Sequence, residues 1–216
     1  MTESLSTPDR LLDAAARLFA ERGIDNVSVA EIVRAADQRN PSAVRYHFGT
    51  ATDLLEAIMA RHVPAIAGRR RELIDQARQQ ADSDRVSAAA AIVLPVTDLA
   101  QRGWRERAYL RIGSEMTGAL ERYPARIQEL LARTEGDEAW ELLRERCPEV
   151  PTDLWRVRRE LCIVFVGRAA ADWARLLDSP DGDTGDGVLP ADRFAENLIE
   201  MVLGAMTAPH ADIDDR

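Results

Sequence analysis

The sequence has no lysine, two cysteines and few aromatic residues, which make up 5% of the chain. Cys147 and Cys162 have neither a CxxC nor a Cys/His spacing, so the usual zinc-binding patterns are excluded. An intracellular protein keeps such thiols reduced, and we therefore expect no disulfide. The sequence predicts neither a metal site nor a cofactor.

Long apolar runs are also missing. The longest near the middle of the chain, AAAAIVLPV at 88–96, contains a proline and has about half of the roughly 18 residues that a membrane span needs. The first residues, MTESLSTPDR, lack the basic and then apolar pattern of an export signal. These observations predict a cytoplasmic protein that does not contact a membrane.

Negative charge dominates the chain, but not evenly. The net charge is −9, which taken alone disfavours a polyanionic partner. Residues 1–72 hold ten arginines against ten acids, so the whole excess lies in 73–216, and the segment 34–71 has a local surplus of arginine. Every cation is a guanidinium, which suits phosphates and base edges, although a GC-rich genome also explains the absence of lysine. The N-terminal third is thus the part suited to a nucleic acid.

Strand patterns are nearly absent, and apolar residues recur at spacings of three and four. The fold class predicted is all-α, with an N-terminal three-helix helix-turn-helix domain joined by a long helix to a C-terminal helical bundle. We expect a first helix from Thr7 to Gly23, a second ending near 36–37, a third at 41–47 and a long fourth beginning at Thr50 or Thr52 and containing Pro64. Further helices are expected at 85–101, 104–120, 124–147 with a break at Gly136, 151–178 and 190–207.

Helix caps fix the expected boundaries near the N-terminus. Ser28 followed by Glu31 is a capping box. Asn40 is expected to cap the third helix with Pro41 at its first position, and Gly49 to end it. The loop SPDGDTGDGVLP at 179–190 is too polar to pack. We therefore divide the chain into an N-terminal helical domain at 1–50, a helical bundle at 51–208 and an acidic tail at 209–216.

The three N-terminal helices have the spacing of a helix-turn-helix, in which the third helix enters the major groove. Val44 and Phe48 are four residues apart and are expected to face the core, which leaves Ser42 and Arg45 on the opposite face. Arg45 suits bidentate binding to guanine, and hydroxyls at helix N-termini suit phosphate. The residues predicted to contact DNA are Ser28, Arg39, Asn40, Ser42, Ala43, Arg45, Tyr46, His47 and Thr50.

The runs LLDAAARLFAERGID and SVAEIVRAADQRNPSAVRYHFGTATDLL carry a resemblance that covers about 11–58, with the motif at about 29–48. They resemble the N-terminal domain of the TetR family of transcriptional regulators. This resemblance implies a homodimer that binds a double-stranded DNA operator and is released by a small-molecule effector, and it implies no enzymatic activity. It also implies that 1–50 is the DNA-binding domain and that 51–208 is the ligand-binding and dimerisation domain. The sequence departs from the family pattern at Asp37–Arg39, where the family usually has Ala-Gly-Val, and at Ala51, where it often has a lysine.

The bundle offers candidates for an effector pocket, although plain core packing is the alternative for all of them. The expected pocket residues are His62, Trp104, Tyr109, Met116, Trp140, Phe165 and Trp173, with Arg111, Glu115, Arg168 and Asp172 as polar anchors. Arg69–Arg71 is interpreted as a solvated face. Two apolar stripes, in 151–178 and 190–207, predict a four-helix dimer contact. Its expected residues are Leu161, Trp173, Phe194, Leu198 and Met201.

The function predicted is a dimeric repressor, released from a pseudo-palindromic operator by a largely apolar ligand. No Ser-His-Asp or paired-carboxylate spacing is recognisable, so no catalytic residue is predicted. Two alternatives stay open: a helical enzyme or small-molecule binder with an incidental helix-turn-helix, and an activator instead of a repressor.

Overall fold

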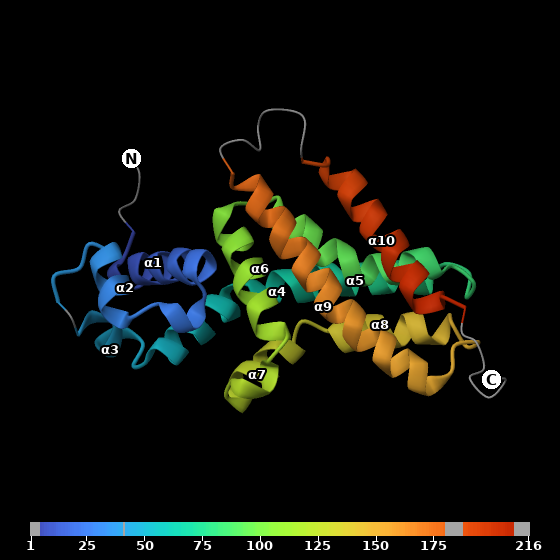
Figure 1. Cartoon of the computed structure of the whole chain (residues 1–216), viewed down its shortest axis with the longest axis horizontal. Helices are drawn as coiled ribbons and strands as arrows, with labels where there is room; N and C mark the ends of the chain where they lie inside the picture. The colour runs from blue at the N-terminus through green and yellow to red at the C-terminus, as the bar shows by residue number, and fades with distance from the viewer. Residues whose placement is uncertain (1–4, 41, 180–187, 210–216) are drawn as a thin grey trace, which may run out of the picture.

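The computed structural model describes residues 5–40, 42–179 and 188–209, and every regular element within these ranges is a helix. The all-α prediction is confirmed. Figure 1 shows a small group of helices, α1 to α3, at one end and a larger helical bundle at the other, with α4 running from one into the other. The elements are α1 (Thr7–Arg22), η1 (Ile24–Asn26), α2 (Val29–Ala35), α3 (Ala43–His47), α4 (Ala51–Arg78), α5 (Arg85–Ala100), α6 (Trp104–Thr117), η2 (Leu120–Arg122), α7 (Ala125–Ala132), α8 (Gly136–Glu145), α9 (Thr152–Leu177) and α10 (Ala191–Thr207).

The first two helices begin and end at the signals that the sequence carries. Ser6 caps α1 by accepting a hydrogen bond from the backbone N–H of Asp9. Gly23, with φ of +89°, ends it. The capping box at the start of α2 is present, since Ser28 and Glu31 exchange side-chain and backbone hydrogen bonds. These boundaries confirm the prediction for α1 and α2.

The turn between α2 and α3 differs from the prediction. Asn40 does not cap the helix: α3 begins at Ala43, with Ser42 in the cap position and no side-chain cap bond. Instead, the Asn40 side-chain oxygen accepts a 2.9 Å hydrogen bond from the Ser42 N–H, a local turn that asparagine favours. Within this turn Asp37 has a left-handed backbone conformation, with φ of +52°. Aspartate tolerates that conformation better than most residues because its side chain can bond locally.

The turn between α3 and α4 depends on a glycine and a cap. Gly49 has φ of +95°, and a Cβ atom there would lie 2.9 Å from an Asp53 carboxylate oxygen. That oxygen is already engaged by the backbone N–H and hydroxyl of Thr50, which closes a capping box at the start of α4. A side chain at position 49 would both strain the backbone and displace the cap. The sharp turn places α3 directly before the long helix.

The bundle follows the predicted helices with two differences. The segment predicted at 124–147 is two helices, α7 and α8, and the break falls at 133–135, directly before the glycine that indicated it. The helix predicted at 104–120 ends at Thr117 and is followed by the short η2. Most of the predicted loop at 179–190 and all but the first residue of the predicted tail at 209–216 lie outside the described residues. No helix in the described ranges is long and apolar enough to cross a bilayer.

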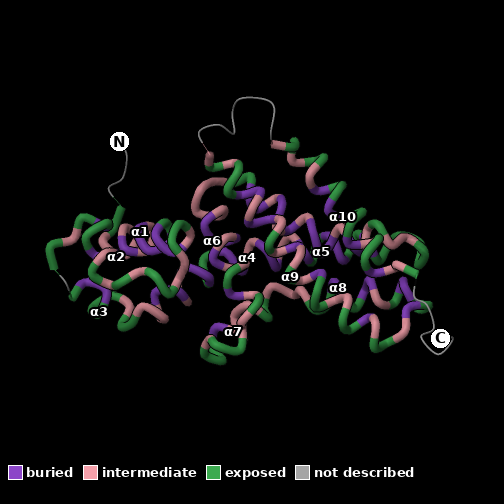
Figure 2. The backbone as a smooth tube through the Cα atoms, viewed as in Figure 1, coloured by how far each residue is buried: buried purple, intermediate pink, exposed green. Residues whose placement is uncertain are grey.

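Buried residues form two clusters, and the first extends from the N-terminal helices into the bundle. In Figure 2 the buried stretches follow the inward sides of the helices at both ends of the molecule. The first cluster joins Phe19, Ile32 and Val44 to Met59 and Met116 without interruption. The second cluster lies among α5, α8, α9, α10 and the last turns of α4. The N-terminal helices are therefore packed onto α4 and α6 rather than tethered by a loop.

Candidate functional site

The outward face of α3 is polar and exposed. Ser42, Arg45, Tyr46 and His47 are all exposed, and Tyr46 is 83% accessible although it is a large aromatic residue. Val44, on the opposite side, is 1% accessible and belongs to the core. α3 is only five residues long, so its position depends on Val44 and on the partly buried Phe48, which packs against the same cluster. A helix anchored by one side leaves the other free for a partner.

The cationic groups on this face have no internal partner. In the described ranges no ion pair or side-chain hydrogen bond involves Arg39 or Arg45. The rings of Tyr46 and His47 lie 4.9 Å apart in an edge-to-face arrangement, so the two side chains leave the end of α3 together. Asn40 is also exposed, beside Ser42. The turn and α3 thus present hydrogen-bond donors to solvent.

Three residues predicted to contact DNA have other roles in the structure. Ala43 is 6% accessible and packs inward, so it cannot form part of a contact surface. The hydroxyls of Ser28 and Thr50 donate to the carboxylates of Glu31 and Asp53, at 2.7 and 2.6 Å. These hydrogen bonds, with those from the two backbone N–H groups, hold the pKa of both carboxyls below their ordinary values. Both hydroxyls therefore serve as caps next to a negative charge rather than as free phosphate donors.

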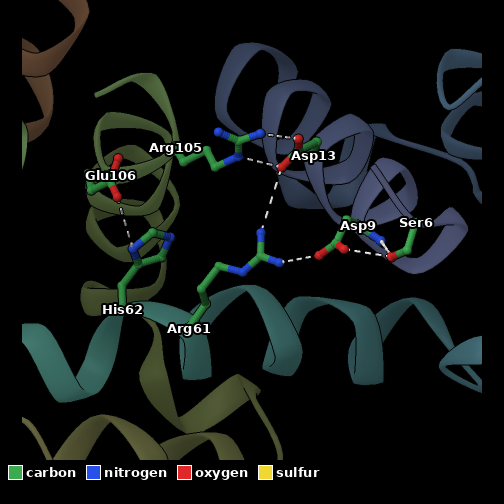
Figure 3. Close-up of polar contacts among 7 residues, drawn as sticks. All are labelled: Ser6, Asp9, Asp13, Arg61, His62, Arg105 and Glu106. Carbon is green, nitrogen blue, oxygen red and sulfur yellow. Dashed lines mark hydrogen bonds and ion pairs between the residues drawn. The ribbon is translucent and has the colours of Figure 1, made fainter. Parts of the chain in front are cut away.

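Charged pairs hold α1 against α4 and α6 (Figure 3). Arg105 of α6 binds Asp13 of α1 through two hydrogen bonds of 2.7 and 2.5 Å. Arg61 of α4 binds Asp9 at 2.6 Å and lies 3.7 Å from Asp13. Two arginines from two bundle helices thus meet two carboxylates on one face of α1, which fixes its position on the bundle.

His62 lies next to this joint, on the buried side of α4. Its Nδ1 is 4.0 Å from a Glu106 oxygen, and its ring lies 5.1 Å from that of Tyr109. Burial lowers the pKa of His62 below its ordinary value, and Glu106 opposes that shift only in part. The histidine connects α4 to α6 as a packed residue, and no group of three metal-ligating side chains occurs in the described ranges.

A cavity of about 370 Å³ lies inside the bundle. Its wall is mostly apolar, with residues from α4 to α9, and its size is in the range of small-molecule sites. Two of its polar residues, Arg70 and Tyr109, are themselves buried. The wall consists of Ile66, Arg70, Ile92, Val96, Tyr109, Leu110, Gly113, Ser114, Thr117, Leu120, Gln128, Leu131, Ala132, Thr134, Gly136, Asp137, Trp140, Ile163, Val166, Gly167 and Ala170.

Of the seven residues predicted for the pocket, Tyr109 and Trp140 line this cavity and five do not. Met116 is fully buried in the first cluster, and Phe165 packs against the second. The remaining three face elsewhere: His62 toward α1 and α6, Trp104 under the guanidinium of Arg17, and Trp173 against Phe194. These five residues therefore fill the core or cover its edge, and only two of the seven candidates lie in the wall.

The predicted polar anchors also point away from the cavity. Arg111 lies 3.9 Å from Asp178, and Glu115 accepts a hydrogen bond from the backbone N–H of Ile24. Arg168 and Asp172 form an exposed pair one helical turn apart. The interpretation of Arg69–Arg71 as a solvated face is wrong for its middle residue, because Arg70 is 6% accessible. The signal in the sequence was its position, since Arg70 continues the apolar positions Val63, Ile66 and Ala67 of α4.

The five residues predicted for a dimer contact divide into buried and exposed sets. Trp173 stacks on Phe194 at 4.5 Å within one chain, and Leu198 is 2% accessible, so the packing of α9 on α10 already covers these side chains. Leu161 and Met201 are exposed, at 66% and 48%. Val157 and Val164 are exposed beside Leu161 on α9, at 58% and 48%, and sequence reasoning did not select them. The outward apolar face is therefore narrower than predicted and lies mainly on α9.

This architecture is similar to that of known regulatory proteins. Residues 11–58 match the family described as bacterial regulatory proteins, tetR family. A bacterial regulatory protein in the tetR family from Rhodococcus RHA1 has a TM-score of 0.61 at 20% identity, over 96% of this chain and 100% of that chain. A TetR-family transcriptional regulator from Bordetella parapertussis 12822 has a TM-score of 0.65 at 17% identity, with the same coverage. The ketosteroid transcriptional regulator KstR2 of Mycobacterium tuberculosis has a TM-score of 0.63 at 19% identity, over 96% of this chain and 98% of that chain.

No curated protein matches the sequence. The solved structures share the fold along almost the whole length of both chains. The match at 11–58 contains the complete helix-turn-helix, from α1 to the start of α4. Residues 11–58 thus match the tetR family of bacterial regulatory proteins, and the chain as a whole has the fold of the solved regulators.

Proposed function

We propose that this protein is a homodimeric repressor that binds a pseudo-palindromic operator in double-stranded DNA and leaves it when a small molecule enters the bundle. The observation that carries the proposal is the exposed surface of α3 and of the turn before it, where Arg39 and Arg45 form no ion pair or side-chain hydrogen bond with any described residue. A cationic side chain that forms no ion pair within the protein does not have to break one when it binds a phosphate or a base edge. The chain as a whole is acidic, so this face, and not the net charge, selects DNA.

Each side chain of the interface has a distinct role in this proposal. Arg45 lies in the helix that enters the major groove, where a guanidinium binds guanine in bidentate fashion. Tyr46 and His47, at the end of α3, bind backbone phosphates, and Arg39 and Asn40 bind phosphates from the turn. Ser42 reaches a base edge or a phosphate beside them. The caps Ser28 and Thr50 hold the two helices in place without contacting DNA.

The dimer forms through α9 and α10 in our proposal. Val157, Leu161 and Val164 occur at spacings of four and three, so they form one exposed apolar stripe on α9, and Met201 lies exposed on α10. An isologous contact would cover this stripe on both copies and pair two recognition helices for two half-sites. Light scattering should return twice the chain mass of 24.0 kDa, and Leu161→Glu should return the single chain mass.

The ligand cavity and α4 make up the switch that we propose. The wall of the cavity includes Ile66 and Arg70 of α4, and the same helix begins with Leu54 and Leu55 under the DNA-binding core. Pro64 lies inside α4 between these two parts. The charged pairs of Figure 3 hold α1 to α4 and α6, so a shift of either helix moves the recognition helix. A ligand that reduces DNA affinity a hundredfold must prefer the DNA-free state by about 2.7 kcal/mol.

Selection from a library of random duplexes tests the function. The protein should enrich a sequence with two-fold symmetry, and the affinity for that sequence should fall steeply as salt concentration rises. A helical enzyme or binder with an incidental helix-turn-helix would enrich no sequence, and that result would remove the proposal. An activator would enrich a sequence equally well, so reporter expression with and without the protein decides between repression and activation.

A further inference from the structure

The cavity in the bundle has an uneven distribution of polar groups. Its apolar wall contains two buried polar side chains, Arg70 of α4 and Tyr109 of α6, which are 6% and 5% accessible. Asp137 of α8 lines another part of the cavity but is exposed, and it pairs with Arg159 of α9. The buried part of the wall therefore contributes a cation and a hydroxyl, and the carboxylate lies at the solvent side.

Arg70 has no anionic partner in the part of the chain that the structure describes. Its Nε donates to the Ala91 carbonyl at 3.2 Å, and its Nη1 donates to the Thr134 carbonyl. Neither acceptor carries a charge, and no ion pair among the described residues includes Arg70. A buried charge without a counter-charge is costly, so such groups are usually paired.

The other buried arginine of the bundle shows what a purely structural role looks like. Arg146 is equally inaccessible, and its guanidinium donates to the carbonyls of Asp84 and Ala77 and to the Ser87 hydroxyl. It does not line the cavity. Both Nη atoms of Arg146 are used, whereas no hydrogen bond in the described ranges uses Nη2 of Arg70. The arginine with an unused donor is therefore the one that lines the cavity.

Both buried groups keep their protons at neutral pH. Burial lowers the pKa of Arg70, but only to about 10, so the guanidinium stays charged. Burial raises the pKa of Tyr109 to about 12, so its hydroxyl remains a donor. Arg70 therefore supplies positive charge at the cavity wall, and Tyr109 supplies a second hydrogen bond.

We propose that the cavity binds an apolar molecule with a single carboxylate, whose two oxygens accept hydrogen bonds from Nη2 of Arg70 and from the Tyr109 hydroxyl. This inference rests on the proposed ligand-responsive function and specifies its ligand class. The apolar wall takes the apolar body of the molecule. A phosphate dianion would bring more charge and more acceptor oxygens than one guanidinium and one phenol can satisfy, which makes the monoanion the better match.

The two ligating residues lie where binding can act on the DNA-binding end. Arg70 belongs to α4, and Tyr109 belongs to α6, the two helices to which α1 is bound by ion pairs. The Tyr109 ring also contacts the ring of His62, which lies beside Glu106. A carboxylate held between Arg70 and Tyr109 would therefore act on the spacing of α4 and α6, the two helices that hold α1.

Calorimetric titration of the DNA-free protein tests the inference with matched acids and alcohols. The probes are octanoate against octanol and phenylbutanoate against phenylbutanol, which differ within each pair only in the charged group. At least one carboxylate should bind more tightly than its alcohol. Arg70→Met should weaken that carboxylate about 10- to 100-fold and change the alcohol by less than about twofold.

Further variants distinguish a loss of carboxylate binding from a loss of the folded structure. Tyr109→Phe removes one donor and keeps the ring, so the carboxylate should weaken about three- to tenfold. Arg70→Lys keeps the charge and should restore part of the affinity that Arg70→Met loses. Thermal unfolding monitored by circular dichroism identifies any variant that has lost its structure, and Tyr109→Phe then decides alone.

Three results would overturn the inference: no carboxylate binds, an alcohol binds as tightly as its acid, or Arg70→Met weakens acid and alcohol equally. The titration contains no DNA, so its outcome is independent of the repressor proposal. If a carboxylate binds at Arg70 but does not release the protein from the selected operator duplex, the proposed ligand class stands and the proposed switch is wrong. If a compound of another kind releases the protein from the operator, the proposed switch stands and the proposed ligand class is wrong.

Discussion

The two ends of the molecule use the same residue types in opposite surroundings. Arg45 and Tyr46 lie exposed on α3, while Arg70 and Tyr109 lie buried at the wall of the cavity. The exposed pair is fully hydrated and can exchange water for phosphate or base at little cost. The buried pair lies in a less polar environment, where a hydrogen bond to an anion is electrostatically stronger than in water. Residue type alone therefore does not separate a DNA contact from a ligand contact, and burial does.

The largest effect is expected where the two ends share a core. Met59 of α4 is fully buried in the cluster that joins the N-terminal helices to the bundle. Met59→Ala should lower the free energy of unfolding by about 2–5 kcal/mol, because it leaves a cavity in a packed interior. Val86→Ala, at an exposed position of α5, is the control and should change it by less than about 0.5 kcal/mol.

Denaturant unfolding should show this loss in both ends together. If the N-terminal helices unfolded in a separate early transition while the bundle kept its stability, the shared core would not couple them.

The next effect is expected at the charged joint of Figure 3. Asp13 accepts two hydrogen bonds from Arg105, and its side chain is only 14% accessible. Asp13→Asn removes the negative charge and one acceptor, so stability should fall by about 1–3 kcal/mol. Asp25→Asn breaks the exposed pair with Arg122 and should cost less than about 1 kcal/mol. Equal losses in urea titrations of the two variants would show that the joint contributes no more than a surface pair.

A third prediction concerns the DNA-binding end alone. Arg45→Ala should weaken binding to the selected duplex by about 1–3 kcal/mol and relax the preference for one base in each half-site. Arg78→Ala is the matched control, because it removes the same charge from the far end of α4 and breaks only an exposed pair with Glu138. Fluorescence anisotropy with labelled duplex measures both. Wild-type affinity in Arg45→Ala would place the recognition surface elsewhere.

The smallest effect is expected from the one buried histidine of the described chain. The pKa of His62 is lowered on folding, so the unfolded chain binds a proton below the ordinary value of 6.5 that the folded chain does not bind. Stability should therefore fall as the pH drops through and below about 6.5. His62→Gln should reduce this loss, and His47→Gln, at an exposed position, should not. A thermal midpoint of His62→Gln that falls with pH as steeply as the wild-type midpoint would contradict the assignment.

The sequence predicted the fold well where local rules decide it. Capping residues and glycines gave the ends of α1 and α2 and the break before α8, because each signal acts within a few residues of itself. The predicted start of α3 was wrong because the Asn40 side chain can accept a hydrogen bond either as a helix cap or within a local turn, and here it does the second. The exposed face of α3 was predictable from the four-residue spacing of Val44 and Phe48.

The cavity and the dimer face could not be predicted in the same way. Which helix covers Trp173, and which carbonyl groups Arg70 meets, depends on packing between segments that are distant in sequence. The sequence therefore identified large apolar residues as pocket and interface candidates, and the structure places most of them in the core. Arg70 was assigned to water because charged residues on helices usually face it.

Protection of guanine N7 from methylation on the selected duplex tests the central claim most directly, because that atom lies in the major groove where Arg45 is proposed to bind. The account predicts protected guanines at two symmetric positions, separated by about one helical turn of 10–10.5 base pairs or a multiple of it, in the wild-type complex. The Arg45→Ala complex, formed at a concentration that saturates the duplex, should lose this protection and keep its backbone footprint. Guanines that stay reactive in the wild-type complex, or that stay protected in Arg45→Ala, would contradict the claim that this face of α3 reads DNA.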